Sequence, residues 1–322
     1  MSSGALRRPA AFETRARTQR AGPCDIDILM CPSTVVSIDG QIVSKDDAKI
    51  SVFDRGLLYG DSVFETIATH GGKPFMLAEH IQRLRRSAGL VYIDLPVDDE
   101  VLVREVNEAL SAAGNAESYL RLIVTRGTGE LGLDPSFSEG TCRILIVAPL
   151  TRPAPAAYAK GVSAISYRTQ RTAEATEASG AKVGNYLVAV LAMRQAKAVE
   201  ANEALIVNAQ GRVVEGATSN VFVKVDGKVL TPPESAGIIV GITRQLVLGC
   251  AKEANIEVAF GSPSLEEVYN AEEVFITSSV REMLPVVKLD DRIVGRGAPG
   301  PVFRELWDRY CEFVRAERAK IV

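Results

Sequence analysis

One lysine in the second half of the chain stands in a context that could support covalent chemistry. Lys182 lies in the stretch Gly180–Leu187, just before a strongly apolar segment that predicts a helix over 183–199. A lysine in a partly desolvated pocket loses basicity, and its neutral amine can form a Schiff base with an aldehyde. Taken alone, the pattern favours an ordinary solvated lysine at a helix start.

Two further stretches place a polar group beside glycine. Glu215 stands between two valines and a glycine at the turn into a predicted strand, where a carboxylate could hold the proton of a pyridinium ring. The Gly-Ile-Thr sequence at 241–243 precedes a helix predicted over 243–254, whose free amides and dipole would suit a phosphate. The simpler alternatives are an ordinary turn acid and a plain N-cap at Thr243.

The composition limits which other chemistries are available. Of 322 residues, 47% are apolar, and 37 Lys and Arg balance 40 Asp and Glu, so neither nucleic acid nor an anionic membrane is an expected partner. Small neutral or zwitterionic substrates fit better. Two histidines leave little material for a His-based metal centre or a Ser-His-Asp triad, so no metal is expected. Five scattered cysteines without a CxxC pair indicate a reducing, cytoplasmic location.

The helices and strands predicted around these residues indicate an α+β protein with two domains. Residues 34–148 predict a small domain, and 149–160, with three prolines at its start, predicts a linker to a larger domain over 161–322. No transmembrane run appears. In the small domain we expect a hairpin over 34–43, helices over 77–89 and 98–113, and strands over 119–126 and 142–147. In the large domain we expect strands over 162–167, 203–207, 220–225 and 274–277, and helices over 183–199, 243–254 and 301–316.

The first 33 residues predict a disordered extension. They are rich in arginine and small residues but lack the apolar core of a secretory signal. A transit peptide is the alternative, because Glu13 is the only acidic residue before Asp25, and Met30 could be the true start.

One motif points to a different fold and is set aside. Residues 127–132 match GxGxxG after a predicted strand, as a dinucleotide-binding turn would. Such a turn must open a helix, whereas the following residues 133–138 include Pro135 and lack a helical period. We therefore expect a flexible loop here.

The stretches around Lys182, around Glu215 and at 241–243, together with 54–65 and 79–84, resemble in their order and spacing the class IV, fold-type IV pyridoxal-phosphate enzymes. The resemblance extends from Val35 to Val314. The family includes branched-chain aminotransferases, D-amino-acid aminotransferases and aminodeoxychorismate lyases. The resemblance implies a small N-terminal and a larger C-terminal α/β domain, pyridoxal 5′-phosphate as cofactor, amino-acid and 2-oxo-acid substrates, and a homodimer or an oligomer of dimers.

The same resemblance implies roles for individual residues around the cofactor. His80 is expected to pack and hydrogen-bond near the phosphate rather than to catalyse. Around the ring, the resemblance implies Lys182 as the Schiff-base residue and catalytic acid/base, Glu215 as partner of the pyridine nitrogen and Tyr186 as donor to the ring oxygen. Around the phosphate it implies Arg83, Ile242, Thr243 and Ser279.

The substrate pocket is expected to resemble that of branched-chain aminotransferases. Tyr119 and Arg121 match their Tyr-x-Arg pattern, and alternation along a strand puts both side chains on one face. An ordinary amphipathic strand would give the same pattern. Tyr59 and Phe64 match aromatic pocket residues.

Other features leave the preferred substrate open. D-amino-acid aminotransferases carry an Arg and a His in the loop after this strand, and 127–132 has neither. Against the branched-chain assignment, Ala68 replaces an Arg, and Arg281, beside Val280, stands where small residues are usual. Both Val280 and Arg281 are expected at the substrate, and Arg281 could clamp a carboxylate. We predict ping-pong transamination of a branched-chain L-amino acid with 2-oxoglutarate; a D-amino-acid aminotransferase and an aminodeoxychorismate lyase-type enzyme are the alternatives.

Overall fold

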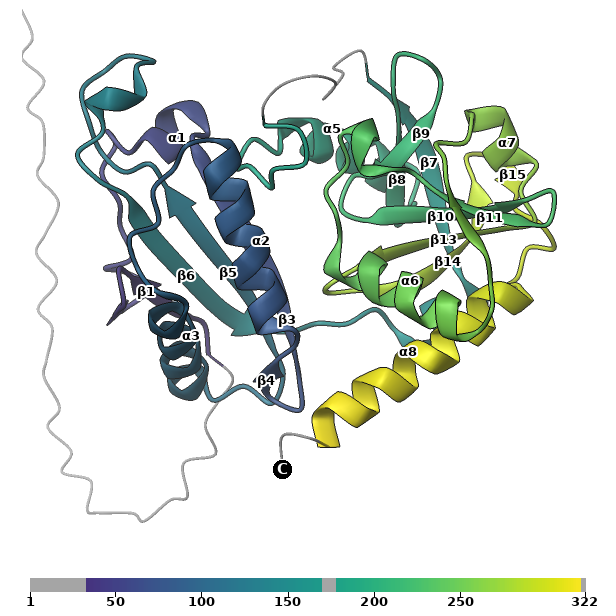
Figure 1. Ribbon diagram of the computed structural model, residues 1–322, viewed down its shortest axis with the longest axis horizontal. Coiled ribbons are helices and arrows are strands. Elements are labelled where there is room, and N and C mark those ends of the chain that lie inside the picture. Colours follow the sequence, from purple (N-terminus) through teal and green to yellow (C-terminus); the bar gives the residue numbers. More distant parts are fainter. Residues whose placement is uncertain (1–32, 170–177, 320–322) are drawn as a thin grey trace, which may run out of the picture. The chain divides into compact units, whose positions relative to one another are not determined.

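Two β-sheets organise the part of the chain that the computed structural model describes, residues 33–169 and 178–319 (Figure 1). A six-stranded sheet is built before residue 150 and a nine-stranded sheet after residue 160. The predicted mixed α/β fold is therefore confirmed, while the domain boundaries stay a prediction. The predicted N-terminal extension, the possible transit peptide and the alternative start at Met30 lie outside the described residues, except for Ser33.

The six-stranded sheet is antiparallel, with the order β2-β1-β6-β5-β3-β4. Alternate side chains of its central strands, such as Val63 and Leu120, form an apolar core with two helices on one face. The strands are β1 (Val35–Ile38), β2 (Gln41–Val43), β3 (Ser62–His70), β4 (Lys73–Pro74), β5 (Ser118–Thr125) and β6 (Cys142–Pro149). The two helices are α2 (Leu77–Leu90) and α3 (Asp99–Ala113); α1 (Arg55–Tyr59) and the 3-10 turn η1 (Pro135–Phe137) flank the sheet.

The nine-stranded sheet has the order β12-β11-β10-β13-β14-β7-β8-β9, with β15 added beside β14. It curls, because β9 at one end of this order also contacts β10. Its strands are β7 (Val162–Arg168), β8 (Glu203–Val207), β9 (Val213–Gly216), β10 (Asn220–Val225), β11 (Lys228–Thr231), β12 (Val258–Phe260), β13 (Glu273–Ser278), β14 (Glu282–Leu289) and β15 (Arg292–Ile293). Its helices are α4 (Pro155–Lys160), α5 (Leu187–Ala198), α6 (Ile242–Glu253), α7 (Leu265–Tyr269) and α8 (Pro301–Ala319), with the 3-10 turn η2 (Glu234–Ala236).

Alternation along the strands gives this sheet two apolar cores. Val221 and Val223 point into one core, which α7 closes, whereas Phe222 between them points into the other, against α6 and α8. Because both faces are covered, the strands lack a polar face. This explains why their sequences read as continuous apolar runs.

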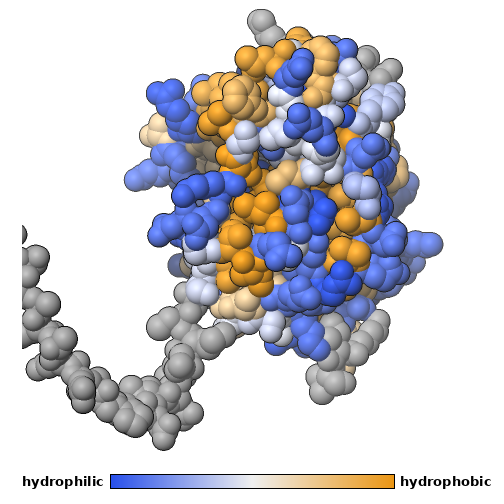
Figure 2. Space-filling view, turned by 90° about the vertical axis from the view of Figure 1, so that its left-hand side faces the viewer, coloured by the Kyte–Doolittle hydropathy of each residue, from blue (hydrophilic) through white to orange (hydrophobic). Residues whose placement is uncertain are grey.

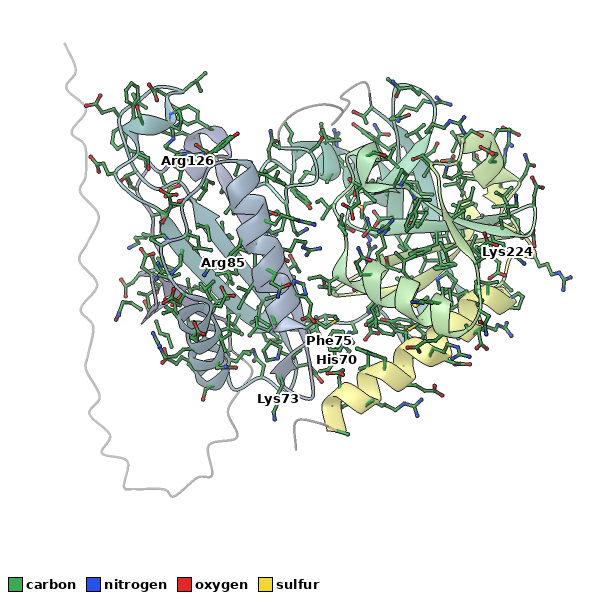
Figure 3. All side chains as sticks on the ribbon, in the orientation of Figure 1. His70, Lys73, Phe75, Arg85, Arg126 and Lys224 are labelled. Atoms are coloured by element: carbon green, nitrogen blue, oxygen red, sulfur yellow. The ribbon has the colours of Figure 1, made fainter. Side chains whose placement is uncertain are left out.

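The surface and one end of the first sheet show further apolar contacts. Figure 2 shows apolar side chains among polar ones on the side of the molecule that carries the six-stranded sheet. At the end of β3, the rings of His70 and Phe75 pack 4.8 Å apart, and Phe75 lies 6.4 Å from Phe313 of α8 (Figure 3). The first sheet thus contacts the closing helix of the chain.

None of the helices within 33–169 and 178–319 is long and apolar enough to cross a membrane.

The helix predicted directly after Lys182 begins four residues later than expected, at the start of α5. The residues before it run extended beside β3 instead: the Phe64 N–H donates to the Lys182 carbonyl (2.9 Å), and the Gly184 N–H donates to that of Ser62 (2.7 Å). A Cβ on Gly184 would lie 2.1 Å from the Ser62 hydroxyl, so only glycine permits this approach. Helical periodicity carries no signal for such pairing.

Other departures from the predicted elements have similar causes. β3 could not be predicted from the sequence, because the strand is buried on both faces and its residues therefore do not alternate between apolar and polar. β14 contains Pro285, which argues against a central strand. The GxGxxG segment 127–132 forms a loop and opens no helix, so rejection of the dinucleotide fold is confirmed. The predicted linker 149–160 contains α4.

Candidate functional site

A cavity of about 450 Å³ collects residues from both sheets. Its size is that of a small-molecule site. Five of the seven predicted cofactor residues line it, and they come from four separate segments of the chain: Arg83, Lys182 and Tyr186, Glu215, and Ser279.

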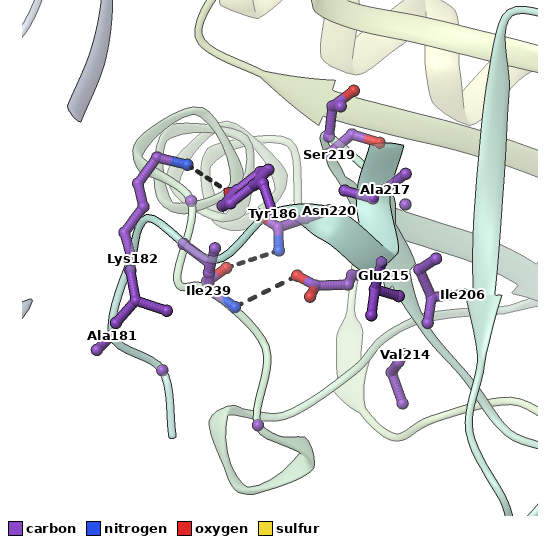
Figure 4. A pocket seen from close by; sticks show the side chains of 18 of the residues that line it. Ala181, Lys182, Tyr186, Ile206, Val214, Glu215, Ala217, Ser219, Asn220 and Ile239 are labelled. Atoms are coloured by element: carbon purple, nitrogen blue, oxygen red, sulfur yellow. Dashed lines mark hydrogen bonds between the residues drawn. The ribbon is translucent and has the colours of Figure 1, made fainter. Parts of the chain in front are cut away.

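Lys182 and Tyr186 meet on one wall of this cavity (Figure 4). The Lys182 Nζ donates to the Tyr186 hydroxyl over 3.0 Å and lies 4.5 Å from the centre of the Phe64 ring. Burial, assisted by the positive charge of Arg83, lowers the pKa of Lys182 from 10.5 to about 8. Far more of the amine is therefore neutral near neutral pH than for an exposed lysine, and nucleophilic attack on an aldehyde requires the neutral form.

Glu215, at the end of β9, carries a carboxylate that points into the same cavity (Figure 4). Its Oε2 accepts a hydrogen bond from the Ile239 N–H over 3.3 Å, and Asn220 holds the Ile239 carbonyl at 2.8 Å. Burial raises the pKa of Glu215 to about 7. A cationic N–H donor from a ligand would stabilise this carboxylate strongly.

Arg83 is held at the cavity by a fully buried carboxylate. Its Nε and Nη2 donate to the two oxygens of Glu65 over 2.7 and 2.6 Å, and its Nη1 donates to the Val240 carbonyl over 2.9 Å. His80 adds a 2.7 Å contact to Glu65. Burial alone would raise the pKa of Glu65, but the bonds from Arg83 and His80 outweigh it and lower the pKa to about 2. Among the described residues, these bonds use three of the five N–H donors of Arg83, which leaves two for an anion.

The start of α6 lies against the cavity through Gly241, and the phosphate role expected for Ile242 and Thr243 is one for their backbone amides. Ile242 and Thr243 are its first two residues and are buried outside the cavity lining, whereas their neighbour Gly241 lines it. Gly241 is also the N-cap, so Thr243 is not. A Cβ on Gly241 would lie 2.1 Å from the Asn220 side-chain oxygen. Any anion held here would therefore be bound by backbone amides of the first turn.

The expected substrate residues lie near the cavity without lining it. The Phe64 ring is close to both cations, with the Lys182 Nζ 4.5 Å and the Arg121 Cζ 3.9 Å from the ring centre. Thr66 is paired with Arg121 in the β3–β5 register and does line the cavity. Tyr119, two residues from Arg121, shares this face of the sheet.

Tyr59 lies further away and belongs to another contact. Its hydroxyl accepts a hydrogen bond from the Gly132 N–H over 3.1 Å. The Arg55 guanidinium donates to the Gly132 and Leu133 carbonyls over 2.9 and 3.2 Å. α1 therefore organises the loop 127–133.

The structure turns Arg281 away from the cavity. Its guanidinium forms an ion pair with Glu203, which is 0% exposed, and Val280 beside it is also outside the cavity lining. The guanidinium already has a carboxylate partner within the chain. This geometry therefore does not support the expectation that Arg281 clamps a substrate carboxylate.

Three polar residues with a role in the site are not predicted from the sequence. Glu65 holds Arg83, Asn220 holds the Ile239 loop, and the Ser87 hydroxyl of α2 accepts from the Lys182 N–H over 3.1 Å. The one available signal was a glutamate within the apolar run of β3. The other two sit in ordinary polar positions.

Comparisons with known proteins agree with this geometry. The family described as amino-transferase class IV matches residues 62–289. A Methanocaldococcus jannaschii protein, whose name assigns it provisionally to the branched-chain-amino-acid aminotransferases, is 38% identical over 85% of this chain and 94% of its own. A D-alanine aminotransferase of Bacillus licheniformis is 31% identical over 89% of this chain and 99% of its own. The structure of a T.th. branched-chain amino acid aminotransferase with pyridoxamine 5′-phosphate is 31% identical, with a TM-score of 0.79 over 87% of this chain and 93% of that one.

Proposed function

The chain belongs to the class IV aminotransferases, which use pyridoxal phosphate, and on that premise we propose that it moves the amino group of a branched-chain L-amino acid to 2-oxoglutarate through Lys182. The observation that carries the role of Lys182 is its partly desolvated amine, 3.0 Å from the Tyr186 hydroxyl and across the cavity from Glu215. Cytoplasmic location stays a prediction.

The residues present fit the cofactor, and each has a distinct task. Glu215 would accept from the ring nitrogen and Tyr186 would donate to the ring oxygen. Arg83, the amides of Ile242 and Thr243, and Ser279 would bind the phosphate. When bound, the cofactor supplies an electron sink for the carbanion formed at the substrate Cα.

Lys182 would work as anchor and then as acid/base. With its amine free, the Lys182 Nζ would accept the proton that leaves the substrate Cα and would later donate it again, while the cofactor held by the other residues would supply the electron sink. The lowered pKa of Lys182, about 8, suits both directions of transfer near neutral pH. The second half-reaction repeats these steps in reverse with a 2-oxo acid, which predicts ping-pong kinetics.

The branched-chain specificity rests on the shared face of β3 and β5. There Phe64 offers an apolar surface beside the Lys182 amine, and Arg121 supplies the positive charge beside it. An aliphatic side chain would pack on such a surface, and the second carboxylate of glutamate or 2-oxoglutarate would pair with Arg121.

A D-amino-acid aminotransferase is the second candidate, because the D-alanine aminotransferase relative covers 89% of this chain, against 85% for the Methanocaldococcus jannaschii relative, although at 31% rather than 38% identity. The loop 127–132 lacks the Arg and His expected of that branch, which is why we place it second. A lyase of the aminodeoxychorismate type is the third.

A substrate panel separates these three candidates. The purified enzyme is assayed with L- and D-forms of leucine, valine, isoleucine, alanine and glutamate against 2-oxoglutarate and pyruvate. We expect glutamate to form from 2-oxoglutarate with L-leucine, L-valine and L-isoleucine. Faster turnover of D-alanine would instead assign the D-amino-acid branch, and pyruvate release from aminodeoxychorismate without an acceptor would assign the lyase.

We also propose a homodimer in which α1 and the loop 127–133 complete the partner's site. These two segments carry Leu57, Leu58 and Tyr59, and Leu131 and Leu133, all exposed and apolar. Sedimentation of Leu133→Asp at assay concentration should show dissociation and loss of activity, whereas Ile293→Asp, equally apolar and exposed on β15, should stay dimeric. A fully active wild-type monomer would rule this arrangement out.

A further inference from the structure

Two turns of the nine-stranded sheet supply hydroxyl groups to one wall of the cavity. The β9–β10 turn contributes Thr218 and Ser219, and the β13–β14 turn, with the last residue of β13, contributes Ser278 and Ser279. The two turns belong to different strand pairs. The backbones beside them are already adjacent, because Asn220 of β10 pairs with Thr277 of β13, so what remains to be fixed is the position of the hydroxyl-bearing side chains.

A buried carboxylate holds the first of these turns. Glu203, the first residue of β8, is 0% exposed, and its Oε2 accepts from the hydroxyls of Thr218 and Ser219, each over 2.9 Å. Gly216 packs so closely that a Cβ there would lie 2.2 Å from the Ser219 hydroxyl. The turn that follows Glu215 is thus set by the charge of Glu203.

Arg281 connects this carboxylate to the second turn. Its Nη2 contacts Glu203 and donates to the Thr218 hydroxyl over 2.6 Å, and its Nη1 donates to the Asn202 carbonyl over 3.3 Å. The Arg281 N–H also donates to the Ser278 hydroxyl over 3.3 Å. One side chain therefore joins both turns of the hydroxyl wall.

The chemistry of the pair explains why an arginine is needed here. A fully buried carboxylate is strongly destabilised without a counter-charge, and Arg281 provides one with a rigid fork that can reach two partners together. A small residue at 281 would leave Glu203 without its counter-charge and would remove the side-chain link between the two turns, although β10 and β13 would stay paired.

We propose that Arg281, acting through Glu203 and Thr218, is a positioning residue that sets the cavity wall contacted by the amino-acid and 2-oxo-acid substrates. It acts on substrate binding and leaves the proton transfers of Lys182 unchanged. This rests on the aminotransferase function and holds whichever amino acid is the donor.

Three variants of the holoenzyme test the proposal, with KM, kcat and thermal unfolding measured for each. They are Arg281→Met, Arg281→Lys and the double variant Glu203→Gln with Arg281→Met; Arg309→Met, in an exposed pair with Glu305 on α8, is the control. We expect Arg281→Met to raise the KM of donor and acceptor about tenfold with kcat within about twofold. Arg281→Lys should lie between it and wild type.

The double variant separates positioning from simple stabilisation. Removing both charges should restore much of the unfolding temperature, because no buried carboxylate is left without a counter-charge, yet KM should stay high because the side-chain link between the two turns is still missing. Recovery of KM together with stability, or a fall in kcat at unchanged KM, would overturn the proposal. If Arg281→Met does not fold, the other two variants still decide.

A different donor in the wild-type panel would overturn the proposed branched-chain specificity instead. It would leave this test intact, because the variants are compared on whichever donor the wild type uses.

Discussion

The two charged regions of the cavity are built in opposite ways. Lys182 and Glu215 have few partners, and burial moves their pKa values toward each other, down to about 8 and up to about 7. Glu65 and Arg83 are as deeply placed but fully paired, and the pKa of Glu65 is lowered to about 2. In the first region, a ligand can supply the partners that Lys182 and Glu215 lack. In the second region, Glu65 fixes the direction of the Arg83 guanidinium before a ligand binds.

This comparison separates groups that react from groups that position. Perturbed pKa values in a cavity are typical of reactive groups. Arg83 keeps a fixed direction because Glu65 occupies one side of its guanidinium, and an anion need not order it on binding. Substitutions should therefore affect rate in the first region and affinity or stability in the second.

The largest effect is expected for Lys182→Ala, which removes both anchor and acid/base. Turnover should fall by about 10²- to 10⁴-fold from the lost proton transfer alone, which is the usual contribution of a positioned acid/base. The borohydride-reducible adduct with the cofactor should disappear while circular dichroism shows an intact fold. Lys224→Ala is the matched control, because Lys224 lies on the nine-stranded sheet in ion pairs with Glu272 and Glu273 (Figure 3). A reducible adduct in Lys182→Ala would contradict the assignment.

Glu215→Gln should bind the cofactor but lose rate. A neutral amide cannot stabilise a ring N–H⁺, so kcat should fall about 10²-fold, a few kcal/mol of transition-state stabilisation. Glu272→Gln, an exposed carboxylate, should match wild type within about twofold. Activity of Glu215→Gln within that range would mean that another residue holds the ring nitrogen.

The same region predicts a pH dependence for loading of cofactor-free protein. Glu215, with its pKa raised to about 7, is ionised above that pH, and Lys182, with its pKa lowered to about 8, is neutral above that one. The rate of adduct formation should therefore rise with pH through 7 to 8 and then level. Borohydride trapping across pH 6 to 9 measures it, and Glu215→Gln should lose the lower inflection; a wild-type rate that falls with pH would contradict both assignments.

Glu65→Gln tests the paired region and should cost affinity rather than rate. Breaking this buried pair should destabilise the protein by about 3 kcal/mol and weaken cofactor binding about tenfold, with kcat at saturating cofactor little changed. Because the folded pKa of Glu65 lies below its usual value, its stabilisation is present above pH 4.5 and is lost as pH falls toward 2. The difference in stability from wild type should shrink over that range.

A control on the same sheet completes this test. Glu105→Gln breaks the Glu105–Arg143 pair away from the cavity and should reduce stability without changing cofactor affinity. A large fall in kcat for Glu65→Gln at saturating cofactor would remove the distinction between the two regions.

The smallest and most selective effect is expected for Arg121→Ala. Only glutamate and 2-oxoglutarate carry a second carboxylate, so KM for 2-oxoglutarate should rise about tenfold while that for an aliphatic 2-oxo acid changes about twofold or less. Arg104→Ala, exposed on α3, should alter neither. Equal losses for both acceptors would shift the preference to the D-amino-acid or lyase branch.

Sequence by itself determined the parts of the site whose chemistry lies in one residue and its close neighbours. Lys182 before an apolar segment, Glu215 beside glycine and the Gly-Ile-Thr sequence at 241–243 could be recognised because a few adjacent residues carry the signal. Periodicity likewise located α2, α3 and α6 to within about two residues, which is the usual scatter of helix ends.

Tertiary structure alone decided which distant groups meet. Arg83 of α2 bonds to the Val240 carbonyl, 157 residues away, because α2 packs against the loop before α6. Arg281 pairs with Glu203 of β8, because the nine-stranded sheet curls and brings β9 against β10. The extended conformation of the segment around Lys182, paired with β3, could not be predicted from the sequence either. Strand register, sheet curvature and side-chain direction depend on packing over the whole fold, and no local pattern of residues encodes them.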